Sequence, residues 1–194
     1  IVTKKLYTMK MRNLLPALAL GLFMIAGTAT FAQETKMVGG AAMYPSKNIV
    51  ENAVNSKDHT TLVAAVKAAG LVETLQSEGP FTVLAPTNAA FEKLPDGTVA
   101  SLLKPENKKA LQGVLTYHVI AGKNSAADII QDIKDGGGTA EWTTVNGQML
   151  WGMLDGNMVK IKDQAGNVAT VTIADVYQSN GVIHVIDTVL LPEM

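Results

Sequence analysis

The sequence of 194 residues contains no cysteine. Without a thiol, the protein has no disulfide framework, no thiol catalysis, no thiolate metal site and no lipid-modified N-terminal cysteine. Arginine is almost as scarce, because Arg12 is the only one in the chain. Nucleic-acid-binding proteins present a basic face that is usually rich in arginine. We therefore expect no binding to nucleic acid.

Signatures of catalysis are also missing. The sequence has no Gly-x-Ser-x-Gly elbow, no glycine-rich phosphate loop and no His-Glu-x-x-His motif. Its three histidines, His59, His118 and His184, lie at no metal-binding spacing. Residues 163–167 resemble part of a calcium loop, but they lack the alternating acids and the closing glutamate, so they predict a hairpin turn. Scattered carboxylates leave a paired general acid and base open. We expect no catalytic residue, metal or cofactor, and a protein that is not an enzyme.

The first 32 residues have the pattern of a secretory signal peptide, with an extension of eight residues before the first methionine. Lys10 and Arg12 precede an apolar stretch at residues 14–26, and Ala32 supplies a small residue for cleavage. The stretch is shorter than the roughly 20 residues of a membrane span. We expect a secreted or periplasmic protein without a membrane span after cleavage; the alternative is an uncleaved N-terminal anchor. Beyond residue 32, twelve lysines face 17 acidic residues, a net charge of −5.

The rest of the chain predicts a short lead-in and one domain. Residues 33–45 contain Gly39-Gly40 and small side chains, which predict a flexible lead-in, and the domain is placed at residues 46–194. Helical spacing dominates the first part of the domain. After residue 138 the pattern changes to alternation with period two, punctuated by Asn-Gly and Asp-Gly turns. Helices first and strands later predict the α+β class.

Three apolar blocks organise this domain. Residues 81–91 (FTVLAPTNAAF) predict a buried strand, a turn at Pro86 and a short helix. Residues 114–120 (VLTYHVI) predict a second buried strand, and residues 180–187 (NGVIHVID) open the last strand. The order and spacing of the three blocks resemble the fasciclin (FAS1) family from about residue 46 to residue 192. This resemblance implies a wedge of antiparallel β-sheets with several packed α-helices.

Tyr117 and His118 are the first candidate site. In a strand they point to opposite faces, which favours a role in holding the core, with their polar ends hydrogen-bonded. The fasciclin resemblance implies an adhesive role for the same pair. Trp142 and Trp151 are the second candidate, as an exposed apolar patch able to bind a glycan. The alternative for both tryptophans is the sheet core.

The resemblance, the signal-peptide pattern and the missing catalytic motifs together favour a secreted or periplasmic binding module of bacterial type. Such a module mediates cell adhesion, or associates with a protein or polysaccharide partner in the matrix, at the cell surface or in the envelope. The alternative is a carrier of a small hydrophobic ligand, and an envelope hydrolase comes last. A deep apolar pocket between helices and sheet favours the carrier, whereas a flat surface with exposed Trp or Met favours adhesion.

Overall fold

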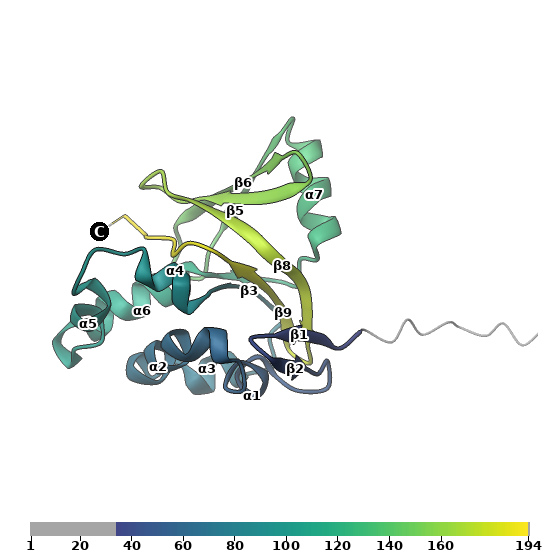
Figure 1. Cartoon of the computed structure of the whole chain (residues 1–194). Coiled ribbons are helices and arrows are strands. Elements are labelled where there is room, and N and C mark those ends of the chain that lie inside the picture. The colour runs from purple at the N-terminus through teal and green to yellow at the C-terminus, as the bar shows by residue number, and fades with distance from the viewer. Residues whose placement is uncertain (1–33, 194) are drawn as a thin grey trace, which may run out of the picture. The chain divides into compact units, whose positions relative to one another are not determined.

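The computed structural model of the chain describes residues 34–193, and the expected signal peptide lies outside this range. A curved sheet carries helices on its flanks (Figure 1), so the prediction of an α+β fold is confirmed. The sheet strands are β3 (Phe81–Pro86), β4 (Val119–Ala121), β5 (Thr139–Thr143), β6 (Met149–Asp155), β7 (Met158–Lys162), β8 (Val168–Gln178) and β9 (Gly181–Ile186). The helices are α1 (Ile49–Ala53), α2 (Thr60–Ala69), α3 (Val72–Gln76), α4 (Asn88–Glu92), α5 (Thr98–Leu102), α6 (Lys108–Tyr117) and α7 (Ala126–Asp135), with short 3₁₀ helices η1 (Lys57–His59) and η2 (Pro105–Asn107).

The strands lie in the order β4-β3-β9-β8-β7-β6-β5. Neighbouring strands are antiparallel, as expected, except for β3 and β9, which run parallel at residues 81–86 and 181–186. These two strands are almost continuously apolar, and side chains on both of their faces are buried. Parallel pairing suits such strands, because it occurs where both faces of a sheet are covered.

Strand β8 bends the sheet. Its register against β9 shifts twice between Val171 and Val176, and Asp175 adopts a left-handed conformation with φ of 55°. Such bulges bend a strand and increase its twist. The two ends of the sheet also meet, because Ile120 bridges to Thr144 and the Val119 carbonyl accepts a 2.7 Å hydrogen bond from the Val145 amide. The sheet therefore wraps around an enclosed core.

The central strands β3 and β9 separate two apolar cores. On one face, Leu84 and Ile186 join the inner residues of β5–β8 and the apolar side of α7. On the other face, Val83 and Val185 pack with α1 and the N-terminal strands. Side chains cap two of the helices: Thr87 caps α4, and Ser125 caps α7 through a capping box with Asp128.

Part of the expected flexible lead-in is instead ordered, because residues 36–43 form a β-hairpin. Strands β1 (Lys36–Val38) and β2 (Ala41–Met43) pair antiparallel around a turn at Gly39-Gly40. Val38 and Met43 are buried against the second core, which gives this short segment the apolar contacts that hold it in place.

The prediction of a strand over residues 114–120 is also wrong in its first half. Helix α6 continues to Tyr117, and only Val119–Ala121 form strand β4. Leu111, Val114 and Leu115 are buried together at helical spacing. This spacing outweighs the β-forming tendency of the individual residues, because side-chain packing decides between the two structures.

Two glycines give a paired test of this packing. A Cβ at Gly152 in β6 would lie 2.4 Å from ring carbons of Trp142, whereas one at Gly113 in α6 would meet no atom within 4 Å. We expect Gly152→Ala to lower the free energy of unfolding by about 1–3 kcal/mol through overpacking. Gly113→Ala is the control and should raise it by about 0.5–1 kcal/mol, because alanine favours the helix. Urea unfolding of both variants tests this, and equal effects would contradict the packing described.

Candidate functional site

The side chain of Tyr117 is fully buried at the end of α6 and joins three parts of the chain. Its hydroxyl donates a 2.7 Å hydrogen bond to the Met149 carbonyl of β6 and accepts one from the Gln164 amide in the β7–β8 turn at 3.2 Å. Burial raises the pKa of this hydroxyl, so it remains a neutral donor and acceptor at ordinary pH. Tyr117 therefore fixes the outer strands to the helix.

His118 follows at the helix C-cap and is 3% exposed. Its Nδ1 lies 2.8 Å from the Val114 carbonyl, and its Nε2 accepts a 3.0 Å hydrogen bond from the Leu190 amide. These partners require the neutral ring with the proton on Nδ1. Burial lowers the pKa of His118 to about 4, although the Val114 carbonyl and the Asp163 carboxylate oppose the fall.

Tyr117 and His118 thus hold the fold together and offer no surface to a partner. Their rings meet edge to face, with centroids 6.5 Å apart, and they do not lie on opposite faces of one strand as the sequence suggested. Nearby Asp163 is buried and accepts hydrogen bonds from the Asn167 and Leu191 amides, at 2.7 and 2.8 Å. The turn expected at residues 163–167 is therefore a hairpin connection between β7 and β8, closed by its own aspartate.

The two tryptophans lie on opposite faces of the sheet, so the predicted shared patch of Trp142 and Trp151 is wrong. In the register of β5 and β6, Trp142 faces Leu150 and Trp151 faces Glu141. Because adjacent residues of β6 point to opposite faces, the two indoles are separated. Trp142 packs against the first core, and its Nε1 donates to the Asp132 carboxylate of α7 at 3.1 Å.

Trp151 lies on the side of the sheet away from that core. We call this side the outer face; it consists of Thr139, Glu141, Thr143, Met149, Trp151, Met153, Lys160, Lys162, Val168 and Thr170. Each of these residues is half-buried or exposed, whereas the alternating inner residues are mostly buried. Trp151 occupies the row between Glu141 and Lys162, and its Nε1 donates a 3.0 Å hydrogen bond to the Glu141 carboxylate.

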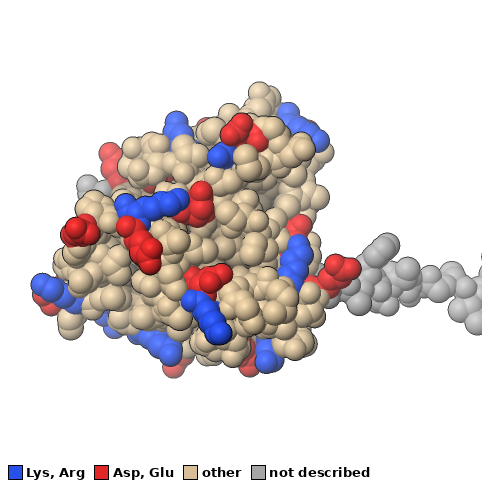
Figure 2. Space-filling model, viewed as in Figure 1, with Lys and Arg blue, Asp and Glu red and all other residues tan. Residues whose placement is uncertain are grey.

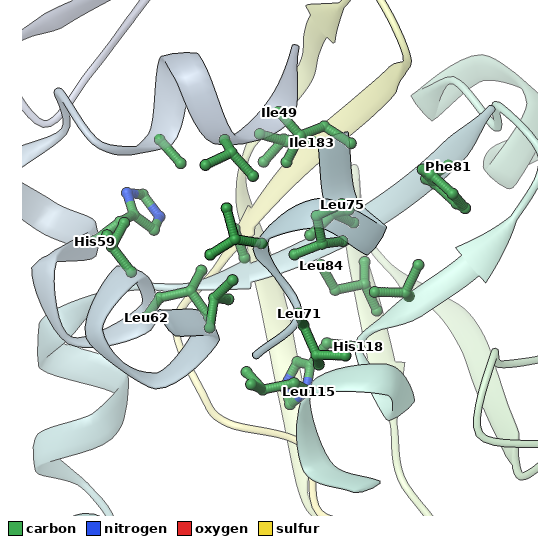
Figure 3. Close-up of a pocket in the computed structure, with 18 of the residues that line it drawn as sticks. Ile49, His59, Leu62, Leu71, Leu75, Phe81, Leu84, Leu115, His118 and Ile183 are labelled. Carbon is green, nitrogen blue, oxygen red and sulfur yellow. The ribbon is translucent and has the colours of Figure 1, made fainter. Parts of the chain in front are cut away.

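A second feature is an apolar cavity of about 90 Å³ between helices α1–α3 and the face of β3 and β9 that carries Val83 and Ile183 (Figure 3). A pocket in this position, between helices and sheet, is what the sequence analysis expected for a carrier of a small hydrophobic ligand. His59 lines it and is 4% exposed, which the sequence analysis missed. The signal was present, because His59, Leu62, Val63 and Val66 follow the i, i+3, i+4, i+7 spacing of one apolar helix face.

Metal and membrane sites are not indicated by residues 34–193. No group of three or more histidine or acidic side chains in this range is placed to hold a metal ion. None of the helices within it is long and apolar enough to cross a membrane. His184 is also structural, because its Nε2 lies 2.9 Å from the Asn124 carbonyl and its Nδ1 accepts from the Asp175 amide at 3.3 Å.

The burial of His118 predicts a pH dependence of stability. Its pKa is about 4 in the folded chain, against 6.5 for the free side chain, so between these values the unfolded chain binds more protons. The free energy of unfolding should therefore fall as the pH drops from about 6.5 to about 4, by about 3 kcal/mol from this residue. Burial lowers the pKa of His59 and His184 as well, which adds to the loss.

The variant His118→Gln isolates this contribution. Glutamine offers an amide donor for the Val114 carbonyl and an oxygen for the Leu190 amide, but it does not titrate. Denaturant unfolding at pH 7 and pH 4 should show a smaller difference for the variant than for the unmodified protein. Parallel stability curves for the two proteins would show that His118 does not control the acid sensitivity.

Comparisons with known proteins agree with this architecture. The family model described as Fasciclin domain matches residues 57–192. Protein sll1483 of Synechocystis sp. is 49% identical over 162 residues, which cover 84% of this chain and 83% of that protein. Immunogenic protein MPB70 of Mycobacterium bovis is 39% identical over 145 residues, which cover 72% of this chain and 66% of the relative.

A solved structure shows the same fold. It is a FAS1 domain pair from the insect cell adhesion molecule Fasciclin I, with a TM-score of 0.56 and 24% identity over 72% of this chain. The match spans 45% of that chain. The three sequence blocks, the family model and the topology agree, and the chain belongs to the fasciclin family.

Proposed function

We propose that this chain is a secreted or periplasmic, non-catalytic binding module that attaches to a protein or polysaccharide partner at the cell surface or in the matrix. The contact surface is the outer face of strands β5–β8. One observation carries the proposal: Met149, Trp151 and Met153 follow one another along the outer face of β6, where each is half-buried and none belongs to the apolar cores of the described residues. Apolar side chains grouped on a surface are typical of interaction sites.

The chemistry of this face fits a contact of moderate polarity. Trp151 presents an apolar ring, while Glu141 and Lys162 flank it in the same cross-strand row and supply charged hydrogen-bonding groups. Tryptophan is enriched among residues that dominate binding energy at interfaces. The outer face is also rigid, because each of its strands is fixed from behind by the first core.

The outer face carries charges of both signs, Glu141 against Lys160 and Lys162, which favours a neutral or mixed partner. Figure 2 shows lysines and acidic residues interspersed on the face that it presents, without a large area of one sign. Long-range attraction to a strongly charged polymer needs such an area. The relation to an insect cell adhesion molecule further supports an adhesive role in this family.

The variant Trp151→Ala tests the outer face. The ring is half-buried on the solvent side of β6, so its removal should leave the inner core and the fold intact. We expect the labelled domain to bind cells of the source organism at least tenfold more weakly, as measured by flow cytometry. Met37→Ala is the matched control, because Met37 is 60% exposed on the distant strand β1 and should bind as the unmodified protein does.

Treatment of the cells separates the two partner classes. Loss of binding after protease treatment identifies a protein partner, and loss after periodate oxidation identifies a polysaccharide. Unchanged binding of Trp151→Ala to untreated cells would contradict the assignment of the outer face.

A further inference from the structure

The cavity beneath the N-terminal hairpin has walls that are almost entirely hydrocarbon. Leu62 and Val66 of α2, Leu75 of α3 and Ile183 of β9 line it, and Figure 3 shows their neighbours converging on the same space. Protein interiors are normally close-packed, with few voids larger than a water molecule. A void of about 90 Å³ with such walls offers water very few hydrogen-bonding partners, and apolar cavities stay dry and accept apolar guests.

Among the polar residues of the lining, His59 has a ring nitrogen whose hydrogen-bonding capacity is not met by the fold. The Nδ1 of His59 lies 2.8 Å from the Ser56 hydroxyl. Nε2 is buried and makes no hydrogen bond of good geometry with residues 34–193, although the Ala85 carbonyl lies near enough to the ring to affect its pKa. Figure 3 shows the ring at one side of the cavity, beside Leu62. A buried polar atom without a partner is costly, and its presence calls for an explanation. Burial lowers the pKa of His59, and the Ala85 carbonyl opposes only part of the fall, so the ring is neutral.

The hairpin both covers the cavity and orients this histidine. Val38 and Met43 contribute to the cavity wall. At the hairpin turn, the Gly39 carbonyl accepts a 3.0 Å hydrogen bond from the Lys57 amide, which precedes His59 in η1. A Cβ at Gly39 would lie 2.2 Å from the Ser56 hydroxyl, so the turn packs directly on the residue that holds Nδ1. The hairpin lies before residue 57, outside the part matched by the family model.

We propose that this cavity binds a small, uncharged molecule of about one ring that carries a hydroxyl group, with the hydroxyl hydrogen-bonded to Nε2 of His59. The volume limits the ligand to one ring at most, because an engineered apolar cavity of about 150 Å³ in another protein holds benzene and this cavity is smaller, at about 90 Å³. An uncharged ligand fits best, because Lys67 is the one charged residue of the lining and the remaining wall is almost entirely apolar, so most of a charged group would lose its water without compensation. A hydroxyl suits both tautomers of the ring, since it donates as well as accepts. This site is separate from the outer face and does not depend on its function.

Phenol and toluene form the matched pair of probes, since they differ only by hydroxyl against methyl. Titrations followed by ¹H–¹⁵N NMR should show both molecules shifting amides that line the cavity, such as those of Leu62 and Ile183. In His59→Phe the ratio of the phenol Kd to the toluene Kd should rise about tenfold, which corresponds to the loss of one hydrogen bond. The control Ser56→Ala removes the other contact of the ring and keeps Nε2, so its ratio should stay within about threefold.

A second readout uses the unmodified protein. Phenol should shift the ¹⁵N resonance of His59 Nε2 strongly, whereas toluene should not. The proposal is overturned if neither probe shifts the cavity amides at millimolar concentration. It is also overturned if the ratio in His59→Phe equals that of the unmodified protein and phenol leaves the Nε2 resonance unchanged. Neither result would touch the outer-face proposal, which is measured on cells.

Discussion

Strands β3 and β9 pair in parallel over six residues each, and nearly every side chain of both is buried. This pair is the constraint on which the domain depends, because it must cover apolar side chains on both of its faces. The first core and strands β5–β8 cover one face, while the helices and the hairpin cover the other. The two candidate sites are therefore next to different cores. The outer face is on the strands that cover the first core, and the cavity lies beside the second core.

Buried polar residues join distant segments of the chain through hydrogen bonds. The Asn180 side chain accepts from the Ile49 amide and donates to the Leu75 and Ser77 carbonyls, which joins α1 and α3 to the start of β9. Tyr117 and His118 join α6 to β6 and to the C-terminal segment in the same way. Buried polar groups in folded proteins are almost always hydrogen-bonded, as these are. His59 departs from this rule, and that departure distinguishes a ligand site from a structural histidine.

The sequence predicts best where its signals are local. The short helix after Pro86, the strands after residue 138 and the hairpin turn at residues 163–167 are determined by neighbouring residues, and the structure contains all of them. The signals that fail depend on distant partners. Residues 36–43 become a hairpin only because the second core covers Val38 and Met43, and the faces of Trp142 and Trp151 follow from a strand register that a pattern alone does not give. The role of His59 likewise depends on walls from three helices and the sheet.

The most direct test of this account is native-state hydrogen exchange, measured amide by amide. The account predicts that the amides of residues 83–85 and 183–185 exchange only when the whole domain unfolds, because they belong to the central pair. The amides of the hairpin should exchange through a smaller opening with a lower free energy, since two three-residue strands cover the second core and its cavity. Central amides that exchange through a local opening, or hairpin amides as protected as the central pair, would contradict it.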